Sequence, residues 1–174
     1  MCEQLIAAVR KGIMMPELNP KHVQTVIDII NRGPYFRHLS MPVKDIGKGY
    51  SLVELDIGNE HLNPFGGLHG GVYASAIDTA AYWAAYCEVD EDAGLVSIDL
   101  KVDYLAAINT GKLIIKGRSL KIGRTMCFAE ATILDRNDKW LAHGSSKLMV
   151  TKDLQAIGNI IDFVGGAGFP PKFI

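Results

Sequence analysis

The stretch between His69 and Cys87 restricts the fold more than any other part of the sequence. After two glycines it reads VYASAIDTAAYWAAY, so alanine and larger apolar residues occupy almost every side of a helix, with Asp78 near the middle. A helix that is apolar all round belongs inside a protein or inside a membrane. A transmembrane span needs about 20 apolar residues without an ionised group at its centre. Asp78 and the strand patterns on both sides therefore favour a buried central helix.

Alternating apolar residues predict strands before and after this helix. Two extended segments are expected at residues 36–46 and 50–57. Residues 96–104 alternate most clearly, with apolar side chains at the even positions and Ser97 and Asp99 among the odd ones. Further strands are expected near residues 112–120, 124–134 and 140–150. This order predicts an α+β fold in which a curled antiparallel sheet wraps around one long central helix.

The two ends of the chain depart from this pattern. Asn19 and Pro20 are suited to the start of a helix, and Gly33 and Pro34 are suited to its end. Residues 165–171 are rich in glycine and proline, and they are expected to form a poorly ordered arm or one that docks on a partner subunit. The length of 174 residues favours a single domain between these ends.

Composition argues against several classes of protein. The 18 basic and 19 acidic residues give a net charge of −1, which speaks against general binding to nucleic acid or to a membrane surface. Three cysteines without paired spacing indicate reduced thiols, and the five histidines lack the spacing of a metal site. The first residues lack the basic start and apolar length of a signal peptide, so a cytoplasmic protein is expected.

The segment NPFGGLHGG, from Asn63 to Gly71, leads into the central helix. Glycine loses the most backbone freedom on folding, so this cluster at a helix entrance is costly. Gly70 and Gly71 could let a substrate carbonyl lie against the first N–H groups of the helix, which would form an oxyanion hole. A glycine-rich turn that only allows the helix and the sheet to pack closely explains the pattern equally well.

Asp78 is the second unusual residue. A carboxylate among Ala74 and Ile77 loses hydration unless partners compensate, and such a group is suited to act as a base or a nucleophile. Asp78 follows His69 by nine residues, about 13 Å along a helix, so one chain does not bring the two together. A dimer with antiparallel helices could do so. The alternative is a structural aspartate that is hydrogen-bonded to Ser75 or Tyr82.

Weaker candidates lie in the strand region. Ser97 could hydrogen-bond a carboxylate or a water molecule, although a surface serine is the commoner case. Gly123 and Arg124 form a turn in which backbone and guanidinium could bind a phosphate together, with Lys147 nearby in the pattern. Solvated strand edges explain the lysines of this region equally well.

Asn63, the His69-Gly70-Gly71 triplet and Asp78 nine residues later resemble the hotdog-fold acyl-CoA thioesterases of the phenylacetate-pathway (PaaI-like) type. The likeness continues through the segments LVSID and DYL and through Gly123-Arg124. It covers residues 35–151 as the hotdog thioesterase domain. An N-terminal helical extension at 1–34 and a C-terminal tail at 152–174 depart from the pattern, and either could alter the preference for acyl-chain length.

The resemblance implies a role for each matching residue. Asp78 would be the general base or the nucleophile, and the Gly70 N–H would polarise the thioester carbonyl beside His69. Asn63 and Ser97 would help to place the carbonyl and the attacking water. The residues matched to coenzyme A binding are Gly71, Gly123, Arg124 and Lys147.

The resemblance also implies a reaction and an assembly. A small-to-medium, potentially aromatic acyl-CoA would be hydrolysed to the free acid and coenzyme A. No metal or other cofactor would be required beyond the coenzyme A of the substrate. The protein would be a homodimer or homotetramer with its sites at the dimer interface, and it would bind neither nucleic acid nor membranes.

Three other functions stay open at this point. A non-catalytic acyl-CoA-binding sensor on the same fold is the main alternative, but the presence of Asp78 and Asn63 speaks against it. A hotdog-fold hydratase would place its aspartate and histidine differently. An acyl-carrier protein, rather than coenzyme A, could carry the acyl group.

Overall fold

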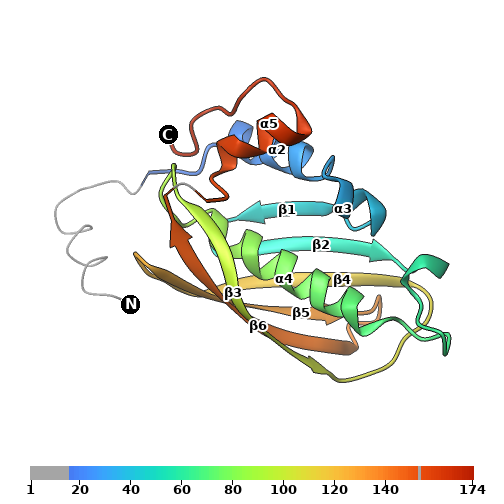
Figure 1. Ribbon diagram of the computed structural model, residues 1–174. Coiled ribbons are helices and arrows are strands. Elements are labelled where there is room, and N and C mark those ends of the chain that lie inside the picture. The colour runs from blue at the N-terminus through green and yellow to red at the C-terminus, as the bar shows by residue number, and fades with distance from the viewer. Residues whose placement is uncertain (1–15, 153) are drawn as a thin grey trace.

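The computed structural model describes residues 16–152 and 154–174, which form one sheet, a central helix and a cover of shorter helices (Figure 1). The six strands are antiparallel and lie in the order β1-β2-β4-β5-β6-β3. They are β1 (Val43–Gly47), β2 (Tyr50–Asp56), β3 (Gly94–Tyr104), β4 (Lys112–Ile122), β5 (Met126–Leu134) and β6 (Trp140–Thr151). The predicted α+β hotdog architecture is confirmed.

The central helix α4 (Gly70–Tyr86) lies in the concave face of the sheet, as Figure 1 shows. Its apolar side chains are buried, among them Ala76, Ile77 and Ala80 with no exposed surface. Gly117 on β4 lets the strand come close to the helix, because a Cβ there would collide with the Ala80 carbonyl. The small residues of both elements therefore allow a full-length helix to fit inside a strongly curved sheet.

A bulge at Ile98 changes which side chains of β3 face α4. Ser97 pairs with Leu148 of β6 and Asp99 pairs with Lys147, so Ile98 is an extra residue in the ladder. The strict alternation expected over 96–104 is therefore wrong before the bulge. Before the bulge the odd-numbered Ser97 is on the side of the strand that faces α4, where its hydroxyl reaches Asp78, although Ser97 itself stays exposed.

The extended segment expected at 36–46 is wrong in its first half. Residues Pro34–His38 form a short helix, α3, and β1 begins only at Val43. Pro34 has the fixed φ that suits the first turn of a helix, and Gly33 precedes it. The partly buried Phe36 packs against the core from this helix, so an apolar residue that was read as part of a strand belongs to a helical cover.

The C-terminal tail docks on its own chain, contrary to the expected loose or partner-bound arm. Helix α2 (Pro20–Ile30) carries His22, whose Nδ1–H donates to the Pro170 carbonyl at 2.7 Å while its Nε2 accepts from the Tyr86 hydroxyl. Burial lowers the pKa of His22, which favours this neutral ring. Lys172 is fully buried and donates to the carbonyls of Tyr86 and Val89. The tail therefore ties α2 to the end of α4.

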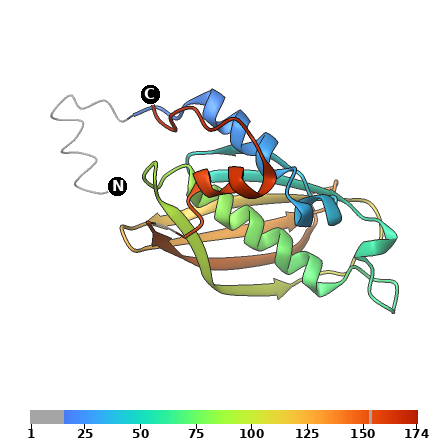
Figure 2. The same ribbon diagram turned by 45° about the horizontal axis from the view of Figure 1, so that its top comes forward.

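Two short helices, η2 (Ile157–Asn159) and α5 (Ile160–Val164), precede this docked tail. Figure 2 shows α5 over α4 and beside α2. The part of the predicted N-terminal extension at residues 1–15 lies outside the described residues. No helix within the described ranges is long and apolar enough to cross a membrane.

Candidate functional site

Asp78 and Ser97 form a hydrogen-bonded pair between α4 and β3. The Ser97 hydroxyl donates to Asp78 Oδ1 at 2.7 Å. Asp78 is half-buried, not fully buried as its apolar neighbours suggested. The alternative of a structural aspartate bonded to Ser75 or Tyr82 does not hold. The Ser75 hydroxyl donates to the Gly71 carbonyl and pairs with the Tyr35 hydroxyl, and the Tyr82 phenol hydrogen-bonds the backbone of Leu95. Asp78 therefore presents a carboxylate that is held by one oxygen and reachable from a cavity.

A cavity of about 710 Å³ opens beside this pair. Apolar side chains from α3, α4, η2 and α5 surround it, including Phe36, Trp83, Ile160 and Phe163. Its size falls within the range of pockets that take small-molecule ligands. Burial raises the pKa of Tyr82, another lining residue, to about 12, so its phenol stays neutral near pH 7. The cavity thus combines an apolar wall with one carboxylate.

The N-terminal end of α4 is shaped by His69. The His69 ring caps the helix, because its Nδ1 accepts the Gly71 N–H at 2.9 Å. This bond occupies the Gly71 N–H, so the prediction that both Gly70 and Gly71 are open to a substrate carbonyl is wrong for Gly71. The Gly70 N–H has no hydrogen-bond partner within the described ranges, while the Gly70 carbonyl accepts from the Tyr104 hydroxyl at 3.2 Å. The Gly70 N–H is therefore a backbone donor that the His69 cap leaves unpaired at this helix end.

Asn63 holds the loop that precedes the helix. Its Oδ1 accepts the N–H groups of Phe65 at 2.9 Å and Gly67 at 3.2 Å. Gly66 has a φ of 81°, a conformation that favours glycine. A Cβ at Gly70 would meet only the Tyr104 side chain, at 3.3 Å, and no backbone of the sheet. Backbone packing of helix against sheet therefore does not require the glycine at Gly70, and the nearest neighbour of that position is the Tyr104 side chain of β3.

The structure brings together one half of the predicted constellation and separates the other. Ser97 meets Asp78, whereas Asn63, His69 and Gly70 lie at the helix entrance, about 12 Å away along the axis of α4 by helical rise. No single chain can place one small substrate group against both. The separation inferred from residue spacing is thus present in the fold.

The predicted cationic residues do not gather around the Asp78 cavity. Lys147 forms an ion pair with Asp99 on the outer face of the sheet. Arg124 is exposed in the turn between β4 and β5, where the Gly123 N–H donates to the Met126 carbonyl. The assignment of these residues to coenzyme A stays a prediction, and Arg124 is better placed for it because no described carboxylate pairs with it.

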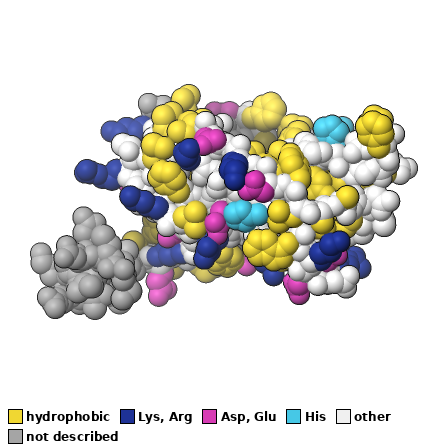
Figure 3. Space-filling view, turned by 90° about the horizontal axis from the view of Figure 1, so that it is seen from below, with side chains coloured by type: hydrophobic (Ala, Val, Ile, Leu, Met, Phe, Trp, Pro, Cys, Tyr) yellow, Lys and Arg dark blue, Asp and Glu magenta, His cyan; other side chains and the backbone are white. Residues whose placement is uncertain are grey.

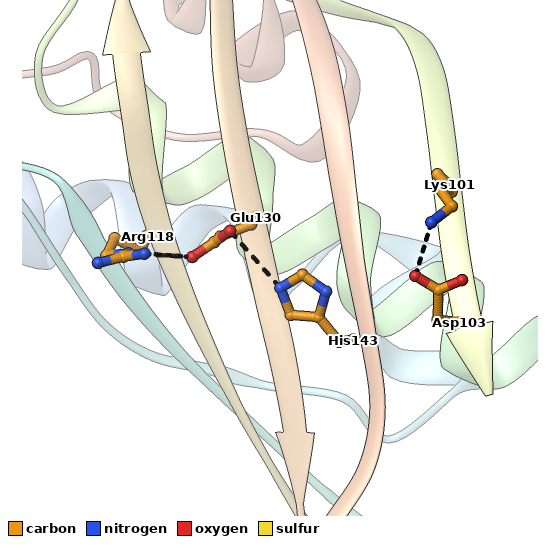
Figure 4. A network of polar contacts seen from close by, with 5 residues as sticks. All are labelled: Lys101, Asp103, Arg118, Glu130 and His143. Atoms are coloured by element: carbon orange, nitrogen blue, oxygen red, sulfur yellow. Dashed lines mark hydrogen bonds and ion pairs between the residues drawn. The ribbon is translucent and has the colours of Figure 1, made fainter. Parts of the chain in front are cut away.

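The molecule seen from below shows charged and histidine side chains among apolar ones (Figure 3). Five polar residues of the outer face of the sheet form contacts that the sequence did not predict (Figure 4). Glu130 on β5 lies between Arg118, which donates to Oε1, and His143, whose Nε2 is 3.5 Å from Oε2. Lys101 and Asp103 pair on β3, 2.9 Å apart. Exposed ion pairs of this kind contribute little to stability, and the network lies across the sheet from the Asp78 cavity.

Sequence reasoning missed the residues that line the cavity from outside the motif. Phe36 was assigned to a strand, and Ile157, Ile160 and Phe163 to a tail. The available signal was the run of apolar residues IIDFV at 160–164, which is unusual for a solvated tail. Which side chains residues 160–164 pack against depends on the tertiary structure, and the periodicity of the sequence does not predict it.

Comparison with known proteins shows which family the chain belongs to. The model of the Thioesterase superfamily matches residues 65–142. Human acyl-coenzyme A thioesterase 13 is 30% identical over 98 residues, which cover 55% of this chain and 69% of that protein. The chain belongs to the thioesterase superfamily. A candidate esterase of Caenorhabditis elegans is 33% identical over 106 residues, and the match spans 62% of that protein, just under two thirds of its length.

Solved structures agree with this membership. A thioesterase from Haemophilus influenzae superposes with a TM-score of 0.71 at 20% identity, covering 81% of this chain and 98% of its own, which shows the shared fold. A candidate esterase from Mycobacterium tuberculosis superposes with a TM-score of 0.66 at 26% identity, covering 68% of this chain and 97% of its own. The predicted enzyme class, thioester hydrolase, is confirmed at the level of the family.

Proposed function

We propose that this member of the superfamily is an acyl-CoA thioesterase of the PaaI-like type, with Asp78 as its catalytic carboxylate. The observation that carries the proposal is the Ser97–Asp78 hydrogen bond at the edge of an apolar cavity. Ser97 orients one carboxylate oxygen, which leaves Oδ2 directed to a water molecule or to the substrate. The apolar wall suits an acyl group, and no lysine, arginine or histidine is among the described residues that line the cavity.

Hydrolysis would proceed through a tetrahedral intermediate. Asp78 takes a proton from water as the water oxygen attacks the thioester carbon, and the Gly70 N–H stabilises the developing oxyanion. The C–S bond then breaks, and the coenzyme A thiolate leaves and takes up the proton from Asp78. The products are the free acid and coenzyme A. Direct attack by the Asp78 carboxylate, followed by hydrolysis of the anhydride, uses the same groups.

The complete site requires two copies of the chain. Gly70, His69 and Asn63 of one copy would face Asp78 and Ser97 of the other, because one helix holds the two halves about 12 Å apart. Strand β3 supports this arrangement, since it lies at the edge of the sheet with only β6 beside it in the described chain (Figure 1). Pairing two β3 edges would satisfy their backbone groups. Two such dimers could then form a tetramer.

Coenzyme A is proposed as the carrier on the strength of the human relative, whose name specifies acyl-coenzyme A. Arg124 in the β4–β5 turn is the proposed phosphate ligand, with Gly123 providing a close backbone approach. Guanidinium groups bind phosphates in a bidentate manner, which suits this role. An acyl-carrier protein would instead contact a wider surface around the same turn.

Free-thiol release from a panel of acyl-CoA thioesters tests the proposal. The wild-type protein should release thiol, and Asp78→Ala should lose nearly all of this activity while keeping its fold by circular dichroism. Binding of acyl-CoA without turnover in the wild type would contradict the proposal and identify the protein as an acyl-CoA sensor.

A further inference from the structure

We propose that the C-terminal helices η2 and α5 form one wall of the acyl pocket and select a large, uncharged acyl group. This inference rests on the proposed function, because it names the substrate class of the same site. Ile157, Ile160 and Phe163 of these helices line the cavity that contains Asp78 and Ser97. The tail is thereby assigned a part in substrate choice.

The composition of the cavity wall argues for the class of acyl group. Phe36 of α3 and Trp83 of α4 line the same cavity, so large apolar side chains from four helices contribute to its wall. Phe163 is 78% exposed in the chain alone, which leaves its ring available to a ligand. Burying apolar surface of this kind favours binding in proportion to the area that is removed from water. A long alkyl chain or an aryl group would gain most from such contact.

Charge in the cavity argues against other acyl groups. Lysine, arginine and histidine are absent from the described residues that line it, and Asp78 is its one ionisable carboxylate. An acyl group that ends in a second carboxylate would have no cation to pair with, and it would be desolvated near Asp78. A short acyl group would leave the space of about 710 Å³ mostly unfilled.

The wall is held in position at its N-terminal side by Gly94. A Cβ at Gly94 would collide with the backbone of Leu154, and Gln155 and Ala156 lie close behind it. The tail can therefore pass over the start of β3 only because residue 94 is a glycine and has no Cβ. This close approach sets where η2 enters the cavity.

The other side of the wall is fixed as well. Gly165 follows α5 with a φ of 79°, and its carbonyl accepts from Arg32 Nη2 at 3.1 Å. Lys172 then anchors the chain end under α4 through two hydrogen bonds. A segment that is fixed at both ends needs little further ordering when a ligand binds, so its apolar contacts contribute to affinity.

The wall lies outside the part of the chain that defines the family. The family model ends at residue 142, before η2 and α5 begin. The tail helices thus lie outside the residues that the family model matches, and their selectivity would be specific to proteins that carry them.

Kinetics on acyl-CoA substrates of different size test the wall. The double variant Ile160→Ala/Phe163→Ala should lower kcat/KM for decanoyl-CoA about tenfold, mainly through KM, and should leave kcat/KM for butanoyl-CoA within about twofold. The same kcat/KM measurement on phenylacetyl-CoA shows whether the tail helices favour an aryl or an alkyl group. Leu154→Ala is the matched control, because Leu154 is an exposed apolar residue of the same tail that does not line the cavity.

If the double variant lost kcat/KM equally on decanoyl-CoA and butanoyl-CoA, or lost none on decanoyl-CoA, the proposal that the tail helices select the acyl group would be wrong. Gly94→Ala should reproduce the selective loss, since it displaces the tail turn without changing a lining residue. If the wild type hydrolyses no thioester, the proposed function is wrong, and the role of the tail helices is tested by the affinity for decanoyl-CoA alone. In that case a tenfold weaker Kd of the double variant for decanoyl-CoA supports the wall, and an unchanged Kd rejects it.

Discussion

The two ends of α4 are completed in opposite ways. At the C-terminal end, the Tyr86 carbonyl accepts from Lys172, a buried cation that the tail of the same chain brings there. At the N-terminal end, His69 caps only the Gly71 N–H, and the Gly70 N–H is left without a partner in the part of the chain that the structure describes. A helix favours cations at its C-terminal end and anions at its N-terminal end.

This difference separates an end that the chain completes by itself from an end that the proposed mechanism would use. The chain uses its own tail to complete the end that needs only stability. It leaves the Gly70 N–H unpaired at the other end, where the proposed mechanism would place the developing negative charge. Asp78 lies between the two, and its partner Ser97 comes from a strand 19 residues further along the chain. Substitutions near Asp78 and Gly70 should therefore change activity, and those near Lys172 should change stability.

The largest effect is expected for Asp78→Asn. The amide keeps the shape of the side chain and can still accept from Ser97, but it cannot take a proton from water. Thioester hydrolysis should fall by about 10²–10⁴ in kcat, with little change in the melting temperature. A variant that keeps more than about a tenth of the wild-type rate would show that Asp78 is not the catalytic carboxylate.

Ser97→Ala should have the next largest effect on activity. Hydrogen bonds to charged groups are worth about 1.5–3 kcal/mol, so kcat should fall about ten- to a hundredfold as the carboxylate loses its orientation. Ser145→Ala on the outer face is the matched control, because Ser145 is an exposed serine of β6. Equal rates for the two variants would place Ser97 outside the site.

Lys172→Met tests the opposite end of α4. It removes both hydrogen bonds to the Tyr86 and Val89 carbonyls and leaves these buried groups without donors. The free energy of unfolding should fall by about 1–3 kcal/mol, as measured by urea denaturation. The kcat on a short acyl-CoA should stay within about threefold of wild type. A large loss of kcat on this substrate would break the distinction between the two ends.

The stability that depends on Lys172 should rise with pH. Burial lowers the pKa of Lys172 to about 8 in the folded protein, below its ordinary value of 10.5. The unfolded state therefore binds more protons above pH 8, and the free energy of unfolding increases there. Between pH 8 and 9 the wild type should gain up to about 1 kcal/mol relative to Lys172→Met. A constant difference between the two proteins would contradict this.

The smallest effect is expected at the helix cap. His69→Ala should lower the free energy of unfolding by about 1 kcal/mol, because the Gly71 N–H loses its acceptor. Asn at position 69 is a strong cap, so His69→Asn should restore stability. Restored activity in the same variant would show that His69 acts by positioning the loop, whereas an inactive but stable His69→Asn would indicate a direct contact with the substrate.

The parts of the site that the sequence could predict are those whose partners lie close along the chain. The apolar helix, the glycines at its entrance and the isolated Asp78 are visible as local pattern. The bulge at Ile98, which turns Ser97 inward, depends on a one-residue shift against β6 that no alternation pattern reveals. The cavity wall at Phe163 depends on a tail that crosses Gly94, and this contact exists only in the folded chain.

The most direct test of the account is the activity of mixed subunits. Asp78→Ala and Asn63→Ala chains are each expected to be inactive, since each lacks a different half of the site. Co-expressed in equal amounts, they should recover about a quarter of wild-type thioester hydrolysis, because half of the dimers then contain one intact site. Activity no higher than that of the separate variants would contradict a site shared between two copies of the chain.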